Sequence, residues 1–349
     1  MKLNHKKINI TIHPGYAKTG TTFLQTKIFN KLGFVNLGKP HNIEDKLIRE
    51  LSILQNQIFR PNNSFRIFNP KYSFRKIYPR NYSYLIKRYV SVLKNIISKK
   101  DNINFIWSDE GLFNHITYFG YFNLYLLKEI IELLNDYYET NIKFIISIRN
   151  QHEYLISYYA FNNSIVKKNF GSFDNFLNRV INDEDLSEIY QYDLLIKKIK
   201  KIFNSEILVL PLEELEHDYK NYINKIVNFL NVNIKKDIYD KTSVNKNSKF
   251  INGNKYYNIR TLNFGSGLYR YVAHLHISLK KFKIYEKNFK YLKFIEQLIK
   301  QLIKPKLKIT GNVLLTEDQK RKIQKHFKKS NQNTEKMTNL NLRIYNYYE

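Results

Sequence analysis

The sequence predicts an α/β protein in which a central parallel β-sheet lies between two layers of helices, a three-layer α/β/α fold. Three observations lead to this fold class. Short runs of apolar and β-branched residues, each of strand length, occur at 8–12, 142–149 and 206–212. Each run precedes a segment with apolar residues at helical spacing. Strands that alternate with helices in this way form parallel βαβ units, and the first run also ends in a glycine-containing loop.

The elements follow one another in the order that such a fold requires. Strand 8–12 leads into a helix that begins at Thr22 and that Gly33 closes. A further strand is expected to start at 104 and run into a loop by 113. Helical spacing predicts helices at 124–138, 152–161, 192–203 and 219–232, and a last one after an N-cap at Thr316. We expect a single domain over residues 1–349, with a helical insertion at about 39–100 and a basic helical C-terminal region at about 250–349.

The composition restricts the chemistry. The chain of 349 residues has 58 basic and 30 acidic residues, a formal charge of +28 and no cysteine. Disulfides, thiolate zinc sites and cysteine nucleophiles are therefore excluded. The positive charge attracts polyanions, although many of the lysines are expected to lie in water. No apolar stretch reaches about 18 residues and no signal peptide is visible, so we expect a cytoplasmic protein, with peripheral contact to the inner face of the membrane left open.

The loop after the first strand has the spacing of a phosphate-binding loop with one change. It reads Gly15-x-x-x-x-Gly20-Thr21-Thr22, and Thr21 stands where nucleoside-triphosphate loops have their lysine. Lys18 is the only lysine of the loop. Backbone N–H groups and the start of the following helix can still hold an anion. Without the usual lysine, the loop favours a diphosphate-like group that needs no metal.

The segment "PGYAKTGTTFLQ" resembles the 5′-phosphosulfate loop of the sulfotransferases, which use 3′-phosphoadenosine 5′-phosphosulfate. That loop ends in Lys-Ser/Thr-Gly-Thr-Thr and an aromatic residue. The resemblance implies a sulfotransferase fold of the P-loop type and a nucleotide bound by the loop. Lys18 would contact the bridging and sulfonate oxygens, Thr21 and Thr22 the 5′-phosphate, and Phe23 would lie near the adenine. Gly15, Thr19 and Gly20 complete the predicted loop.

A second station for the nucleotide is predicted in "IISIRNQHEYLISYYAF". The family reads the 3′-phosphate with an arginine at a strand end and a serine eight residues later, and Arg149 and Ser157 fill these positions. A guanidinium suits forked binding of phosphate. Many relatives have proline where this chain has Gln151, which changes the entry of the helix. More weakly, "VNKNSK" resembles a later segment that could offer Lys246 or Ser248 to the nucleotide.

Sulfuryl transfer also needs a base that takes the proton of the acceptor hydroxyl. The segment "IWSDEGLF" is the best source. Glu110 is the first choice and Asp109 the second, with Ser108 as a group that binds donor or acceptor oxygens. A plain helix cap is the competing interpretation of this stretch. His13 and His115 are alternatives for the base; no histidine or carboxylate cluster has metal-ligand spacing, so we predict a metal-independent reaction.

The leading hypothesis is a sulfotransferase that modifies a hydroxyl of a carbohydrate, a glycan or glycolipid of the kind sulfated by bacterial carbohydrate-type enzymes. The basic, aromatic stretch at 278–309 fits an anionic lipid surface, a wall for an acidic sugar chain, or an ordinary helix with solvated lysines. A P-loop kinase is the alternative enzyme. A basic nucleic-acid-binding protein is the second alternative, but no motif supports a nucleic acid as partner.

Overall fold

The computed structural model describes residues 6–16, 18–38, 46–59, 82–101, 103–109, 112, 122–162, 166–167, 170–233, 248–251, 254–262 and 307–349. They belong to two compact units. The first comprises Met1–Leu155, Leu177–Asn245 and Thr316–Glu349, and the second comprises Ile156–Phe176 and Lys246–Leu315. The single domain expected from the sequence stays a prediction.

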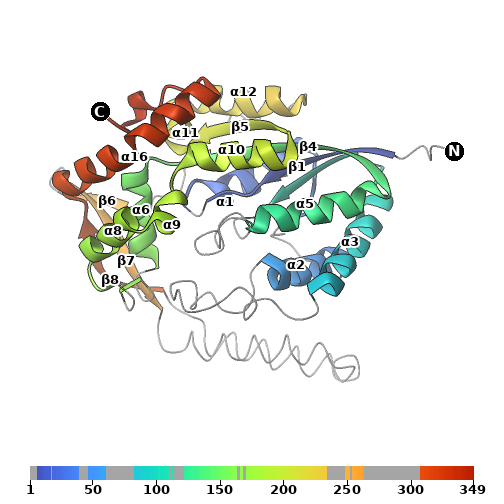
Figure 1. Cartoon of the computed structure of the whole chain (residues 1–349), viewed down its shortest axis with the longest axis horizontal. Helices are drawn as coiled ribbons and strands as arrows, with labels where there is room; N and C mark the ends of the chain where they lie inside the picture. The colour runs from blue at the N-terminus through green and yellow to red at the C-terminus, as the bar shows by residue number, and fades with distance from the viewer. Residues whose placement is uncertain are drawn as a thin grey trace. The chain divides into compact units, whose positions relative to one another are not determined.

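The first unit contains a five-stranded parallel sheet, which confirms the predicted fold class (Figure 1). The strand order is β2-β3-β1-β4-β5, with β1 at the centre of the sheet, so that it pairs with β3 and β4. The strands are β1 (Lys6–His13), β2 (Val35–Asn36), β3 (Asn104–Ser108), β4 (Tyr138–Ile148) and β5 (Glu206–Pro211). All are parallel, so their carboxyl ends share one edge.

Helices cover both faces of this sheet. On one face, the turn after β1 and helix α12 (Tyr219–Leu230) pack on strand residues such as Ile145. Neighbouring residues of a strand point to opposite faces, and the ring of Phe144 lies 5.0 Å from that of Phe203, at the end of helix α10 (Tyr192–Phe203). α10 therefore covers the other face, in line with the predicted three layers.

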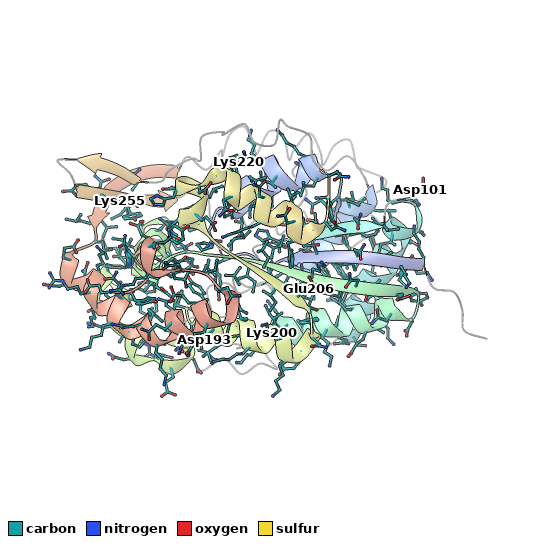
Figure 2. All side chains as sticks on the ribbon, turned by 90° about the horizontal axis from the view of Figure 1, so that it is seen from above. Asp101, Asp193, Lys200, Glu206, Lys220 and Lys255 are labelled. Carbon is teal, nitrogen blue, oxygen red and sulfur yellow. The ribbon has the colours of Figure 1, made fainter. Side chains whose placement is uncertain are left out.

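Two further helices of the first unit lie in the predicted insertion, residues 39–100. Helices α2 (Lys46–Phe59) and α3 (Tyr82–Ser98) lie within it and pack on each other. Helices were also predicted at 124–138 and after Thr316, and α5 (Phe122–Asn135) and α16 (Glu317–Thr338) correspond to them. Thr316 caps α16, as the sequence indicated, and the structure adds a capping box with Gln319. Asp193 of α10 accepts hydrogen bonds from Ser330 and Asn333, which ties α16 to α10; Figure 2 shows Asp193.

The second unit contains an antiparallel sheet of strands β6 (Ser248–Ile251), β7 (Asn254–Leu262) and β8 (Leu307–Leu314). These strands lie in the region that the sequence predicted to be helical, so this part of the prediction differs from the structure. The alternation in "NKYYNIRTL" has the period of a strand, with Tyr257 buried. The stretch on which the helical prediction rested, 278–309, lies mostly outside the described residues.

Candidate functional site

The glycine loop connects β1 to a helical turn at the carboxyl edge of the sheet. Helix α1 (Thr21–Phe23) continues as a π-helical turn (Leu24–Ile28) and a 3₁₀ turn (Phe29–Leu32), which Gly33 ends with a φ of 71°. The predicted helix is therefore present, but it changes its winding. Such π-helical turns are frequent at functional sites.

The two glycines of the loop stand where side chains do not fit. Gly20 has a φ of 78°, in the left-handed region, and a Cβ added there would lie 2.8 Å from Leu212 Cδ1. A Cβ added at Gly15 would lie 2.0 Å from Thr21 Cγ2. The loop therefore folds back tightly on the start of its own helix. This packing explains why the sequence has glycine at both positions.

Lys18 adopts an uncommon backbone conformation. Its φ is 70°, which for a residue with a Cβ costs about 1–2 kcal/mol. The neighbouring Thr19 is fully buried, and its hydroxyl donates to Tyr16 O at 2.6 Å. A strained non-glycine residue in a ligand-type loop is a common sign of function. The chain thus keeps a lysine where glycine would be more stable.

The next two residues of the chain, Thr22 and Phe23, point in different directions. Thr22 is exposed, whereas Phe23 is 8 % exposed and its ring meets that of Tyr219 edge-on at 6.1 Å. Phe23 belongs to the core cluster beneath the loop. Its predicted position near an adenine stays a prediction.

Arg149 leaves the carboxyl end of β4 and lies against the loop. Its Nη1 donates to Lys18 O at 3.3 Å, and its Nη2 donates to Glu153 at 2.8 Å. The side chain is 15 % exposed. A guanidinium has five N–H groups, and the other three have no hydrogen-bond partner among the residues that the structure describes. Two segments that are 131 residues apart, the loop and the end of β4, are thus brought together.

Helix α6 (Gln151–Phe161) begins two residues after Arg149. Asn150 is its N-cap, because Asn150 Oδ1 accepts from Glu153 N at 3.0 Å. The side-chain amide of Gln151 exchanges two hydrogen bonds with Asn331 of α16, at 2.8 and 3.0 Å. This pair holds the Gln151 side chain at the start of the helix, at the position where the sequence departs from the motif that it resembles. Ser157 is buried further along α6, in the second unit, and its predicted role at the 3′-phosphate stays a prediction.

His13 is a buried structural residue beneath the loop. Its ring is hydrogen-bonded to Ser108 Oγ at 2.7 Å and to Ser147 Oγ at 3.0 Å, and Gln25 Nε2 donates to Ser108 Oγ at 3.0 Å. Burial lowers the pKa of His13 to about 3, so the imidazole is neutral at ordinary pH. With both nitrogens engaged, His13 joins strands β1, β3 and β4 and is poorly suited to act as a base.

Asp109 follows β3 at the same edge of the sheet. Its side chain is almost fully buried, with 4 % exposed, and its carboxylate accepts a hydrogen bond from Gln55 of α2 at 2.5 Å. Its backbone N–H donates to His13 O at 3.2 Å, next to the start of the loop. Glu110, the first choice for the base, lies outside the described residues, as do His115 and Lys246. Ser248 begins β6 in the second unit.

Glu213 was missed by the sequence analysis although it lies beside Arg149. It is in helix α11 (Leu212–His217), directly after β5, and it accepts a hydrogen bond from Asn150 N at 3.0 Å. Burial raises the pKa of Glu213 to about 7, against the opposing effects of that hydrogen bond and of the Arg149 charge. An acid that directly follows a predicted buried strand was the available signal.

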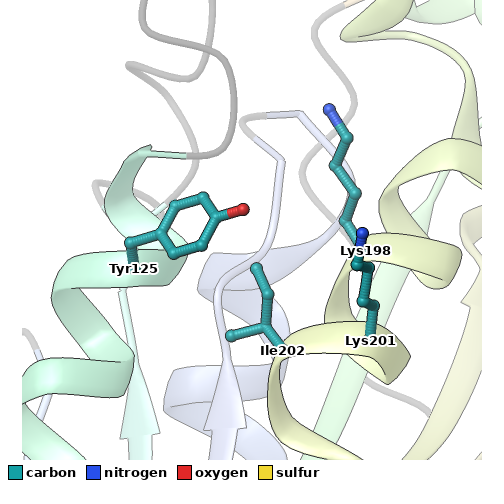
Figure 3. A pocket seen from close by; sticks show the side chains of 4 residues that line it. All are labelled: Tyr125, Lys198, Lys201 and Ile202. Carbon is teal, nitrogen blue, oxygen red and sulfur yellow. The ribbon is translucent and has the colours of Figure 1, made fainter.

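A shallow pocket lies between α5 and α10, apart from this site. It is lined by Tyr125, Lys198, Lys201 and Ile202, and Tyr125 points toward Ile202 in Figure 3. Lys198 is already paired with Glu188 at 2.6 Å. None of the lining residues belongs to the loop or to the end of β4, so the pocket is not part of the candidate site. Within the described ranges, no cluster of three or more His, Asp or Glu residues could hold a metal ion.

No protein-family model and no curated protein matches the chain. Among solved structures, the chain is similar to the sulfotransferase domain from the Synechococcus PCC 7002 olefin synthase, with 14 % sequence identity, 70 % of this chain and 81 % of that chain covered, and a TM-score of 0.34. A likeness of this degree does not decide the function.

Proposed function

We propose that the protein is a sulfotransferase that uses 3′-phosphoadenosine 5′-phosphosulfate and transfers the sulfuryl group to a hydroxyl. The observation that carries the proposal is the position of the Arg149 guanidinium, which lies on the carbonyl of Lys18 and retains three N–H groups without a described partner. A single phosphate loop would suit many nucleotides. A second cationic group against the loop favours a nucleotide with a second phosphate, because a guanidinium binds phosphate through two parallel hydrogen bonds.

The residues present fit such a nucleotide. The backbone N–H groups around Gly20 and the start of α1 suit the 5′-phosphate, and Lys18 suits the oxygens between phosphorus and sulfur. Arg149 suits the 3′-phosphate. When bound, the nucleotide would supply the sulfuryl group. The protein would hold the negative charge that develops on the leaving phosphate, through Lys18 and the loop.

The acceptor side would lie at the end of β3. A carboxylate there could take the proton from the acceptor hydroxyl, and both Asp109 and Glu110 follow this strand. Asp109 is oriented by Gln55 at the edge of the sheet where β1 enters the loop. Glu110 remains the first choice for the base, and a carbohydrate hydroxyl is the proposed acceptor class. Parallel sheets of this kind bind ligands outside the carboxyl ends of their strands, which agrees with this arrangement.

Calorimetric titration would test the proposal with three nucleotides: 3′-phosphoadenosine 5′-phosphate, adenosine 5′-phosphate and adenosine triphosphate with Mg²⁺. We expect the bisphosphate to bind without Mg²⁺ and at least about tenfold more tightly than the monophosphate, because a charge-assisted hydrogen bond contributes about 1.5–3 kcal/mol. Arg149→Ala should remove this preference. Arg179→Ala, a change of an exposed arginine paired with Asp183, is the matched control. Equal affinity of the wild-type protein for the bisphosphate and the monophosphate would refute the proposal, and selective binding of Mg²⁺-adenosine triphosphate would favour a kinase.

A further inference from the structure

The backbone that carries Arg149 is held from two neighbouring elements. The hydroxyl of Tyr192, the first residue of α10, donates to Arg149 O at 2.5 Å. The next peptide N–H, that of Asn150, donates to Glu213 Oε1 at 3.0 Å. Glu213 can reach this N–H because β4 and β5 are paired up to Ile148 and Pro211. The exit of β4 is thereby fixed to the exit of β5.

The second oxygen of Glu213 is bound by the C-terminal tail, residues 339–349, which follows α16. The hydroxyl of Tyr347 donates to Glu213 Oε2 at 3.0 Å, and the Tyr347 side chain is 1 % exposed. The tail also reaches Asn150 directly, because Asn150 Nδ2 donates to Tyr345 O at 3.3 Å. The tail itself is held by α16, since Asn331 Nδ2 donates to Tyr347 O at 3.1 Å. The last residues of the described chain therefore brace the peptide next to Arg149.

We propose that Tyr347 and Glu213 are positioning residues, which fix the Arg149–Asn150 peptide so that the guanidinium faces the glycine loop and selects a nucleotide with a second phosphate. This inference rests on the proposed function. Neither residue needs to touch the nucleotide. The carboxylate of Glu213 joins a backbone donor from the end of β4 to a side-chain donor from the tail. Loss of either donor would leave the strand exit held by fewer bonds, and the guanidinium would occupy a wider range of positions.

The ionisation of Glu213 allows its positioning role to be tested a second way, through the pH dependence of nucleotide binding. Burial raises the pKa of Glu213 to about 7, so both forms of the carboxyl are present near neutral pH. The charged or titratable groups that face it are Arg149 from the end of β4, Tyr192 from α10, Tyr222 from α12 and Tyr345 and Tyr347 from the tail. The protonated form has one oxygen less to accept with. Loss of the proton also adds a negative charge near Arg149. The inference requires that the gain in positioning exceeds this charge effect, so that the selection of the bisphosphate strengthens as Glu213 loses its proton.

The test compares binding of 3′-phosphoadenosine 5′-phosphate and adenosine 5′-phosphate to wild type, Tyr347→Phe and Glu213→Gln. Tyr348→Phe is the matched control, because the neighbouring Tyr348 donates to Glu335 and not to Glu213. We expect Tyr347→Phe to weaken binding of the bisphosphate about fivefold and to leave the monophosphate within about twofold, while Tyr348→Phe changes neither. Between pH 6 and pH 8, the ratio of wild-type to Glu213→Gln affinity for the bisphosphate should rise. The phosphate's own ionisation is common to both proteins and cancels in this ratio.

Two results would overturn the inference and leave the proposed function intact. The first is an equal effect of Tyr347→Phe on both nucleotides, and the second is no effect on either together with a ratio that does not change with pH. If Tyr347→Phe does not fold, the pH dependence of Glu213→Gln decides the question. A wild-type protein without any preference for the bisphosphate would instead defeat the proposed function, and the inference with it.

Discussion

The half-buried carboxyl of Glu213 makes the stability of the protein depend on pH in a direction that is uncommon for an acid. Its pKa is raised from 4.5 to about 7 by burial, which outweighs the hydrogen bonds from Asn150 and Tyr347 and the charge of Arg149. Between these two pH values, the folded protein keeps the proton and the unfolded chain has released it. The unfolded state therefore binds fewer protons, and the free energy of unfolding falls as the pH rises from 4.5 to 7.

The size of the effect follows from the same two values. Each pH unit across the window lowers the free energy of unfolding by about 1.4 kcal/mol, so the full loss approaches about 3 kcal/mol. Glu213 retains some exposed surface, and screening by water reduces the expected loss to about 1–3 kcal/mol. Glu213→Gln has no proton to release. Its amide oxygen can still accept from Asn150 N, and its N–H₂ group can donate to the Tyr347 hydroxyl.

Urea unfolding of wild type and Glu213→Gln at pH 5, 6, 7 and 8 measures this loss. The other titrating groups are common to both proteins, so the difference between the two free energies isolates Glu213. We expect the variant to gain about 1–3 kcal/mol relative to wild type between pH 5 and pH 8. Glu216→Gln, which changes an exposed acid of the same helix, should show no such gain. Parallel pH profiles of wild type and Glu213→Gln would refute the reasoning.

Two further predictions concern the loop and its neighbouring arginine. Lys18→Gly should relieve the positive φ and raise the free energy of unfolding by about 1 kcal/mol relative to Lys18→Ala, while both variants lose transfer of the sulfuryl group. The control Lys27→Ala, at an exposed position on the following turn, should retain this activity. An active Lys18→Ala variant would remove Lys18 from the mechanism. Glu153→Gln should tighten binding of 3′-phosphoadenosine 5′-phosphate about threefold, because it removes a negative charge that lies 2.8 Å from the Arg149 guanidinium. Calorimetric titration measures this affinity. Weaker binding would show that the carboxylate is needed to orient the arginine.

Four of the five parallel strands could be predicted from the sequence, because each of these four carries its own local signal; the two-residue strand β2 and the strand order were not predicted. The runs at 8–12, 142–149 and 206–212 correspond to β1, β4 and β5, and the last two strands end one residue before the predicted end of the run. For a residue that directly follows one of these runs, the order of the sequence shows which strand it follows and that it lies at the carboxyl end of that strand. The sequence alone therefore assigns the loop and Arg149 to the same edge of the sheet.

Contacts between distant side chains could not be predicted in this way. Glu213 and Tyr347 are 134 residues apart, and Gln151 and Asn331 are 180 apart. Glu213 follows a predicted strand directly and Gln151 departs from the motif that the segment resembles, but the chain has 28 tyrosines and many asparagines, so nothing in the sequence marks Tyr347 or Asn331 as their partners. Their pairing depends on how α16 and the tail pack against the other parts of the first unit. The left-handed conformation of Lys18 was equally hidden, because it follows from the close packing around Gly15 and Gly20 rather than from the preference of lysine.

The site therefore combines parts with different origins in the chain. The loop is encoded within a few residues, and its geometry needs only β1, two glycines and the turn that follows. The position of Arg149 is different, because it depends on β5 through Glu213 and on the tail through Tyr347. A phosphate held by the loop would need no tail, whereas a second phosphate would. Selection between nucleotides with one and two phosphates is thus expected to be more sensitive than general nucleotide binding to changes near the end of the chain.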